Sequence, residues 1–248
     1  MTTATADHVD RLETLADLPQ RVAQDHAYEH VKYMIANTPV RPYPFPHMQV
    51  NGVFPEYYYR QMLANYPAAG FFESRIEGYP ERGTIELHDP ASVARLPRQQ
   101  RDFWQWFMNS FGSRDFMSFV LECYAPVLGP RFGHSVKPVA YLFRDTGGYG
   151  IGPHTDTLKK VVTMLFYLPE DESQRGAGTS IVVPTDAKGY SHHPTGHESW
   201  DAYRPAKTIE FLPNTLASFL VTDRSLHAVR PTPPGSVRQS LQFFICQA

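Results

Sequence analysis

The second half of the chain, from about residue 136, is a series of short apolar runs separated by turn residues. Gly, Pro and Asn stand between the runs, for example in residues 147–153 and 212–215. Short strands with regular turn signals predict an antiparallel sandwich or barrel. The run at 161–168 is almost entirely apolar, so we expect it to be buried on both faces of a sheet. The six predicted strands are 139–144, 161–168, 179–183, 208–211, 216–221 and 240–246.

The first half of the chain has the residue spacing of helices. An apolar stripe over roughly residues 8–35 predicts a first helix, since apolar side chains recur every three or four positions. Prolines bound a second helix at 55–65, and aromatic-rich segments predict two more at 97–112 and 115–128. The proline-rich segment 39–47 is expected to be extended. The stripe is formed by Leu12, Leu15, Leu18 and Val22.

Length and composition indicate one α+β domain with a mainly β core. We expect a single domain over 1–248, with residues 1–135 as helical support and 136–248 as the core. The formal net charge of −2 argues against a nucleic-acid partner. We expect no membrane partner and a cytoplasmic location, because no apolar run is long enough to span a bilayer and the first residues are polar. Nothing in the sequence predicts an oligomeric state.

The two cysteines narrow the choice of metal chemistry. Cys123 and Cys246 lie far apart in the sequence and form no C-x-x-C pair. Such usage is typical of a reducing compartment and excludes a zinc–thiolate site.

The segment 185–207 is too polar for a core strand and is predicted to be a long loop. Trp200 in this loop is a candidate to cover a substrate. His192, His193 and His197 cluster in the same segment. No carboxylate pattern accompanies them, so we do not expect a second metal site there.

A candidate metal centre lies where the β-rich half begins. His154 and Asp156 precede a predicted strand, and alternate residues of an extended segment point to the same side. With His227 they supply two imidazoles and one carboxylate, the set that suits non-haem Fe(II) and leaves coordination positions open. His8 and Asp10 have the same spacing, but they lie in a predicted helix, where residues two apart do not face each other.

A candidate anion site follows eleven residues after His227. Arg238 and Ser240 are two residues apart on a predicted strand, so their side chains share one face. A guanidinium and a hydroxyl together suit the far carboxylate of a dicarboxylate ligand.

These motifs, in this order, resemble the Fe(II)- and 2-oxoglutarate-dependent oxygenase superfamily. The matching segments are His-Thr-Asp at 154–156, the distal histidine segment at 225–231 and Arg-Gln-Ser at 238–240. The resemblance covers roughly residues 136–246 and implies a double-stranded β-helix, or jelly roll. Residues 54–67 resemble the helix that leads into the prolyl-hydroxylase-like branch.

The resemblance implies a role for each matching residue. His154, Asp156 and His227 are expected to bind Fe(II), and Arg238 and Ser240 to hold the far carboxylate of 2-oxoglutarate. The reaction expected is O2-dependent decarboxylation of 2-oxoglutarate to succinate and CO2, coupled to hydroxylation or another oxidation of a small-molecule metabolite. Because the carboxylate ligand is present, halogenation is disfavoured.

Three further residues are candidates for the same site, and two other functions stay open. Tyr141 is expected beside the co-substrate, and Arg144 and Lys159 are expected to contact the substrate. One alternative is a peptide or protein side-chain hydroxylase of the same superfamily. Another is a cupin-like metal-binding protein without oxygenase activity, although cupins carry more histidines in the first motif.

Overall fold

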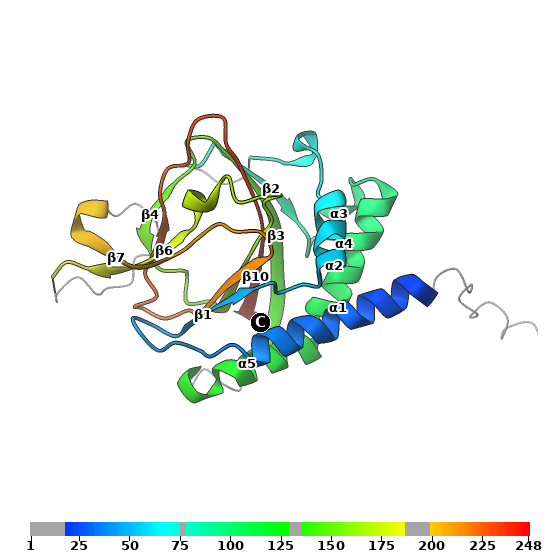
Figure 1. Cartoon of the computed structure of the whole chain (residues 1–248), viewed down its shortest axis with the longest axis horizontal. Coiled ribbons are helices and arrows are strands. Elements are labelled where there is room, and N and C mark those ends of the chain that lie inside the picture. Colours follow the sequence, from blue (N-terminus) through cyan, green and yellow to red (C-terminus); the bar gives the residue numbers. More distant parts are fainter. Residues whose placement is uncertain (1–17, 75–77, 129–134, 187–198) are drawn as a thin grey trace, which may run out of the picture.

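The computed structural model describes residues 18–74, 78–128, 135–186 and 199–248. Within these residues two antiparallel sheets form one side of the molecule and the helices cover the other (Figure 1). The predicted combination of a β-rich second half and a helical first half is therefore confirmed in outline.

The larger sheet has six strands in the order β1-β8-β5-β10-β3-β2, and the smaller has four in the order β4-β9-β6-β7. Every pairing between these strands is antiparallel. The strands of the larger sheet are β1 (His47–Asn51), β2 (Arg82–Glu86), β3 (Val136–Thr146), β5 (Lys160–Tyr167), β8 (Thr215–Leu220) and β10 (Val237–Gln247). Those of the smaller sheet are β4 (Ile151–His154), β6 (Thr179–Pro184), β7 (Tyr203–Ile209) and β9 (His227–Val229).

Strand β5 lies inside the six-stranded sheet and is buried on both faces, as its apolar sequence predicts. Alternate side chains face different layers, because successive residues of a strand point to opposite sides. Val162, Met164 and Phe166 belong to the core cluster shared with the helices. Leu165 and Tyr167 belong to a second cluster that includes residues of the smaller sheet.

The helices pack on the larger sheet through aromatic side chains. Helix α4 buries Trp104, Phe107 and Phe111, which recur at the three- and four-residue spacing of one helix face. No helix in the described ranges is both long and apolar enough to cross a bilayer. The helices are α1 (Leu18–Ala36), α2 (Glu56–Ala64), α3 (Pro90–Ala94), α4 (Arg98–Phe111) and α5 (Arg114–Leu128).

Three of the predicted helices are confirmed to within a residue or two at each end: α2, α4 and α5. The first helix was expected from residue 8, and α1 begins at Leu18. Residues 1–17 lie outside the described part of the chain, and with them the pair His8 and Asp10.

The predicted loop at 185–207 is wrong over its last part. A short 3-10 helix spans Trp200–Ala202, and β7 begins at Tyr203. Strand β7 is the edge of the smaller sheet and pairs only with β6, so most of its side chains face solvent. A polar sequence is therefore compatible with this strand. Residues 187–198, which carry the three clustered histidines, lie outside the described residues.

The first half of the chain also contains two strands that the helical pattern did not predict. β1 and β2 form the two edges of the larger sheet.

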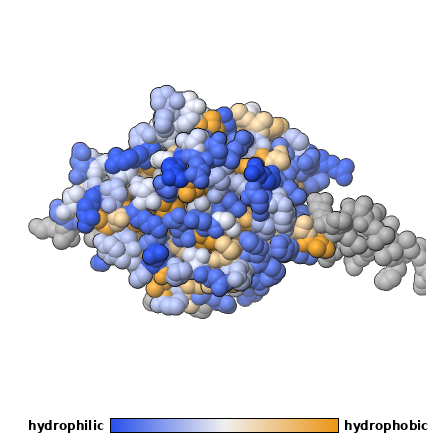
Figure 2. Space-filling model, in the orientation of Figure 1, coloured by the Kyte–Doolittle hydropathy of each residue, from blue (hydrophilic) through white to orange (hydrophobic). Residues whose placement is uncertain are grey.

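On the face seen in Figure 2, hydrophobic residues are interspersed with hydrophilic ones over the molecular surface.

Candidate metal centre

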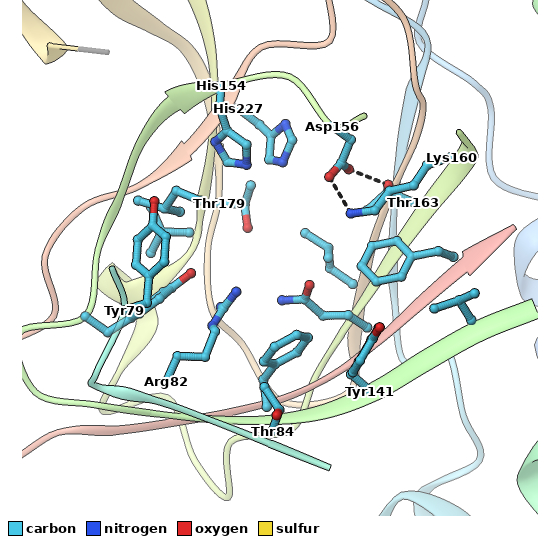
Figure 3. A pocket seen from close by; sticks show the side chains of 18 of the residues that line it. Tyr79, Arg82, Thr84, Tyr141, His154, Asp156, Lys160, Thr163, Thr179 and His227 are labelled. Atoms are coloured by element: carbon cyan, nitrogen blue, oxygen red, sulfur yellow. Dashed lines mark hydrogen bonds and ion pairs between the residues drawn. The ribbon is translucent and has the colours of Figure 1, made fainter. Parts of the chain in front are cut away.

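A cavity of about 670 Å³ lies between the two sheets. Its walls come from β2, β3, β5 and β10 of the larger sheet and from β4, β6 and β9 of the smaller (Figure 3). Polar and charged side chains are concentrated in it. They include Arg82, Glu86, Tyr141, His154, Asp156, Lys160, His227, Arg238 and Gln242.

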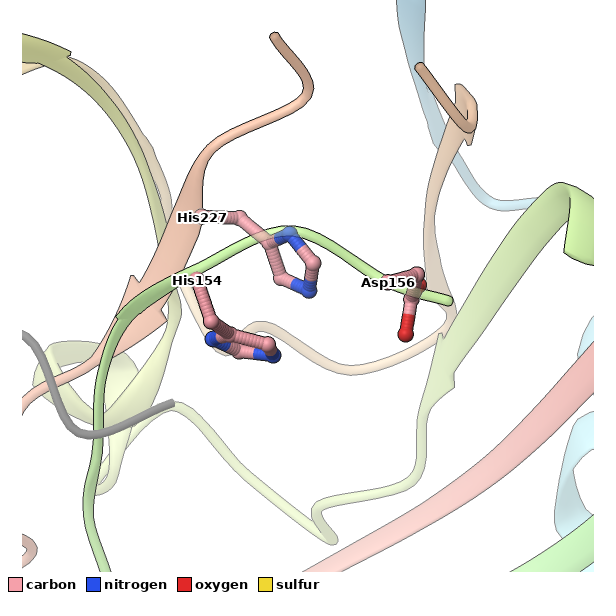
Figure 4. A group of neighbouring side chains, drawn as sticks. All are labelled: His154, Asp156 and His227. Carbon is pink, nitrogen blue, oxygen red and sulfur yellow. The ribbon is translucent and has the colours of Figure 1, made fainter. Parts of the chain in front are cut away.

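The three predicted metal ligands meet in this cavity. His154 ends β4 and pairs in register with His227, the first residue of β9. Asp156 lies two residues beyond β4, and one potential ligand atom from each of the three residues lies within 4.8 Å of the others. All three are buried, and their imidazoles and carboxylate point toward one space (Figure 4). The arrangement predicted from spacing is thus present in the fold.

Hydrogen bonds fix which nitrogen of each imidazole is available. Nδ1 of His154 lies 2.9 Å from the carbonyl oxygen of Gly152, and Nδ1 of His227 lies 2.9 Å from that of Ser225. A carbonyl oxygen only accepts, so each Nδ1 must carry the proton and donate it. Each Nε2 therefore keeps its lone pair, which is the form in which histidine binds a metal.

Asp156 is held in its ionised form by two neighbours. Thr163 Oγ1 donates to Oδ2 at 2.6 Å, and the Lys160 ammonium donates to Oδ1 at 2.5 Å (Figure 3). Burial alone raises the pKa of this carboxyl group. The positive charge of Lys160, with the two imidazoles, outweighs burial and lowers the pKa below its ordinary value.

Burial acts in the opposite direction on the two imidazoles, because it disfavours their charged form. Burial, together with the neighbouring His227, lowers the pKa of His154 to about 3. Burial also lowers the pKa of His227. At neutral pH the group consists of two neutral imidazoles and one carboxylate, and it is ready to bind a divalent cation.

Arg238 lines the same cavity and is almost completely buried, with 1% of its surface exposed. Its Nε donates to the carbonyl oxygen of Ala177 at 2.9 Å, and its Nη1 donates to Asp145 Oδ2 at 3.0 Å. Ser240 is on the same face of β10 by strand alternation and is fully buried, but it is not among the residues that line the cavity. Among the described residues, its hydroxyl oxygen has no hydrogen-bond partner.

Arg82 and Asp145 were not predicted as site residues, and of the two adjacent lysines Lys159 was predicted in preference to Lys160. Asp145 bonds to Arg238 and also to Arg82, which comes from an edge strand in the half expected to be helical. No spacing in a single sequence relates Arg82 to Arg238. Lys160 is the neighbour of the predicted Lys159, and strand alternation selects it to face the cavity.

The remaining candidates are divided between the two faces of the larger sheet. Tyr141, predicted to lie beside the co-substrate, is one of the residues that line the cavity. Arg144 lies on the opposite face of β3 from the cavity-lining Tyr141 and Phe143, and it is not among the lining residues. Lys159 lies in a separate surface depression beside Asp223. The structure therefore does not bring Arg144 and Lys159 to the metal centre.

Solved structures of other proteins share the fold of this chain, although comparisons of its sequence found no match. No family model matches the sequence, and no curated protein is detectably similar to it. Among solved structures, the Fe(II)/α-ketoglutarate-dependent dioxygenase TqaL aligns with a TM-score of 0.51 at 13% identity, covering 92% of this chain and 89% of TqaL. The carbocyclase SnoK from nogalamycin biosynthesis aligns with a TM-score of 0.50 at 10% identity, covering 91% and 86%.

A prolyl-4-hydroxylase from Pseudomonas putida also matches, with a TM-score of 0.49 at 14% identity and coverage of 88% of this chain and 99% of that one. The fold of this chain is that of the Fe(II)/2-oxoglutarate-dependent oxygenases. The resemblance stated from the sequence motifs is confirmed at this level.

Proposed function

We propose that this protein is an Fe(II)- and 2-oxoglutarate-dependent dioxygenase that oxidises a small molecule inside a double-stranded β-helix. The observation that carries the proposal is the convergence of His154, Asp156 and His227 within 4.8 Å in a cavity that Arg238 also lines. A cupin-like binding protein gives no role to a buried arginine in the same cavity as the metal ligands.

The donor set fits Fe(II). Two neutral imidazoles and one carboxylate form a three-ligand site, which leaves open positions for a chelating co-substrate and O2. Each imidazole is oriented by a backbone carbonyl, and the carboxylate by Thr163 and Lys160. Such supporting contacts fix the direction of ligands before the metal arrives.

The opposite wall fits the far carboxylate of 2-oxoglutarate. Arg238 supplies a buried positive charge to the cavity lining. Ser240, two residues further along β10 and not itself a lining residue, has a buried hydroxyl with no hydrogen-bond partner in the described part of the chain. Buried polar groups in native proteins are nearly always hydrogen-bonded, so an unpaired hydroxyl on this face is consistent with a ligand acceptor. Tyr141 completes the polar lining on β3.

When bound, iron with 2-oxoglutarate and O2 supplies oxidative decarboxylation to succinate and CO2, coupled to oxidation of the substrate. The chain itself keeps the two imidazoles neutral and Asp156 ionised, and it holds all three ligands buried in the cavity wall. The 670 Å³ cavity falls within the range of about 300–1,000 Å³ for small-molecule sites. This size supports a small metabolite as substrate.

Anaerobic titration with Fe(II) and 2-oxoglutarate tests the proposal. A chelated iron complex is expected to give a weak visible absorption band, and air is expected to convert 2-oxoglutarate to succinate. His227→Ala should lose both signals, whereas His26→Ala, at an exposed histidine of α1, should keep them. Absence of the band and of succinate in the wild-type protein would refute the assignment. Turnover of extended peptides in preference to metabolites would favour a side-chain hydroxylase.

A further inference from the structure

Three charged side chains form a row across adjacent strands of the larger sheet. Arg82 on β2 pairs in register with Asp145 on β3, and Asp145 pairs in register with Arg238 on β10. Residues in register on neighbouring strands project to the same face, so all three side chains lie side by side. We call Arg82, Asp145 and Arg238 the arginine row.

Asp145 binds both arginines at once. Arg82 Nε donates to Oδ1 at 2.7 Å and Arg82 Nη2 donates to Oδ2 at 3.0 Å, which is the bidentate geometry of a strong ion pair. Oδ2 also accepts from Arg238 Nη1 at 3.0 Å. Arg82 therefore fixes the orientation of the carboxylate, and Oδ2 is left in position to accept from Arg238 as well.

Arg82 is itself held rigidly. Its guanidinium carbon lies 4.2 Å from the ring centroid of Phe143 and 4.2 Å from that of Tyr149. Both contacts are within the range of cation–π interactions. Figure 3 shows the Arg82 side chain pointing into the cavity from the side opposite the metal ligands.

The charges of the row do not cancel. Asp145 is fully buried and Arg238 is 1% exposed, while the Arg82 side chain is 11% exposed. Two guanidinium groups share one carboxylate, so the row keeps one net positive charge. An uncompensated buried charge is costly, and a single ligand carboxylate would compensate it.

The other acidic side chains that line the cavity do not offset this charge. Asp156 belongs to the metal ligands and is paired with Lys160 at 2.5 Å. Glu86 is four residues from Arg82 on β2, and its carboxylate lies 3.7 Å from His88 Nε2. The row is therefore suited to one anionic group that comes with a ligand.

We propose that Asp145, clamped by Arg82, is a positioning residue that aims the Arg238 guanidinium and makes the cavity select a 2-oxo acid with a carboxylate at its far end. This inference rests on the proposed function and adds two residues to it. Arg82 acts through Asp145, and of the two arginines only Arg238 contacts the far carboxylate.

Arg238 needs partners that fix the orientation of its guanidinium group. Arginine has a long side chain with many rotamers, and fixing it costs entropy unless partners hold it. Ala177 fixes Nε and Asp145 fixes Nη1, while the ring of Phe211 lies 4.7 Å from the guanidinium carbon. Without the Asp145 acceptor, the guanidinium plane is held by Ala177 and by the rings of Phe211 and Tyr167, the second of which lies 5.6 Å away, and Nη1 loses its only charged partner among the described residues.

Asp145→Asn separates positioning from simple charge attraction. The substitution keeps the volume and raises the net charge of the row from +1 to +2. If charge attraction alone mattered, 2-oxoglutarate should bind more tightly. If the orientation of the Arg238 guanidinium matters, 2-oxoglutarate should bind more weakly. The assay is anaerobic titration of the Fe(II) protein, followed by the visible band, with 2-oxoglutarate and with 2-oxopentanoate. The second ligand has the same chain length but lacks the far carboxylate.

We expect Asp145→Asn to weaken 2-oxoglutarate binding about 10- to 100-fold, the loss typical of a hydrogen bond to a charged group. Binding of 2-oxopentanoate should change by less than about 2-fold, because this ligand does not reach the row. In turnover, the KM for 2-oxoglutarate should rise while kcat is largely kept.

Variants of Arg82 give a second, independent measurement. Arg82→Lys keeps the positive charge but loses the bidentate hydrogen bonding of the guanidinium to Asp145. We expect it to weaken 2-oxoglutarate binding less than Arg82→Met does. Arg144→Met is the matched control, since it removes an arginine next to Asp145 on the opposite face of β3. Thermal unfolding of each variant checks that the fold is intact.

Two results would overturn the inference while leaving the proposed function in place. One is unchanged or tighter binding of 2-oxoglutarate by Asp145→Asn. The other is an equal loss for both ligands, which indicates general damage to the site. If the wild-type protein gives no band with either ligand, the proposed function fails and the inference fails with it.

Discussion

Acid should weaken the fold of the metal-free protein, with His154 as a main cause. Its pKa is about 3 in the folded state, compared with about 6.5 in an unfolded chain. Between these values the unfolded state binds a proton that the folded state does not. The free energy of unfolding therefore falls as the pH decreases below about 6.5, and it is unaffected by this group at higher pH.

The magnitude follows from the same two values. Each pH unit between them costs about 1.4 kcal/mol, so lowering the pH from 7.5 to 4.5 removes about 3 kcal/mol. His227, whose pKa is also lowered, acts in the same direction. Asp156 has a lowered pKa too, but its contribution is lost only as the pH falls below the ordinary carboxyl range. Its stabilisation is therefore constant between pH 7.5 and 4.5, and it does not contribute to the change in stability over this range.

Urea unfolding in the presence of a chelator measures this effect. The wild-type protein and His154→Gln are compared at pH 7.5, 6.0 and 4.5, with His26→Gln as the control at an exposed histidine. Glutamine does not titrate, so the His154 variant should lose much less stability on acidification, and the control should behave as wild type. Identical pH dependence in all three proteins would refute the assignment of the effect to His154.

Three further perturbations test the site and the core. Asp156→Asn should abolish divalent metal binding in calorimetric titration with Mn(II), because it removes the only carboxylate of the three-residue group. Trp104→Ala should lower the free energy of unfolding in urea by about 3–5 kcal/mol, since the indole is fully buried and donates to the carbonyl oxygen of Asn65 at 2.9 Å. Asn214 has a φ of 53° and bonds to both the backbone N–H and the carbonyl of Phe54. Asn214→Ala should cost about 2 kcal/mol in the same assay, and Asn214→Gly should recover part of it.

The interior strands could be predicted from the sequence, and the edge strands could not. β5 is buried on both faces, so its sequence is apolar and distinctive. β7 exposes most of its side chains, and its sequence is as polar as that of a loop. β1 and β2 lie far from the other strands along the chain. They are strands because they pair with β8 and β3, and neither pairing leaves a signal in the local sequence.

The residues of the candidate site likewise fall into those that could be predicted from the sequence and those that could not. The pair His154 and Asp156 could be predicted, because the spacing of two residues places both on one side of an extended segment. Arg82 and Asp145 could not, since their contact joins residues 63 positions apart and depends on the register of β2 against β3. A single sequence contains the local geometry of a site but not the pairing that brings its distant parts together.

The two parts of the site belong to different sheets, so sheet packing sets their separation. His154 and His227 come from the smaller sheet, while the arginine row comes from the larger. Three hydrogen bonds among the described residues join the two sheets here. Arg238 Nε donates to the carbonyl of Ala177, which precedes β6. Tyr167 Oη on β5 donates to Thr179 Oγ1 on β6 at 2.7 Å and accepts from the Thr179 backbone N–H at 3.2 Å. A ligand that binds both the metal and Arg238 must match the distance that these contacts hold. The helices pack on the opposite face of the larger sheet, so they support the site through the position of that sheet.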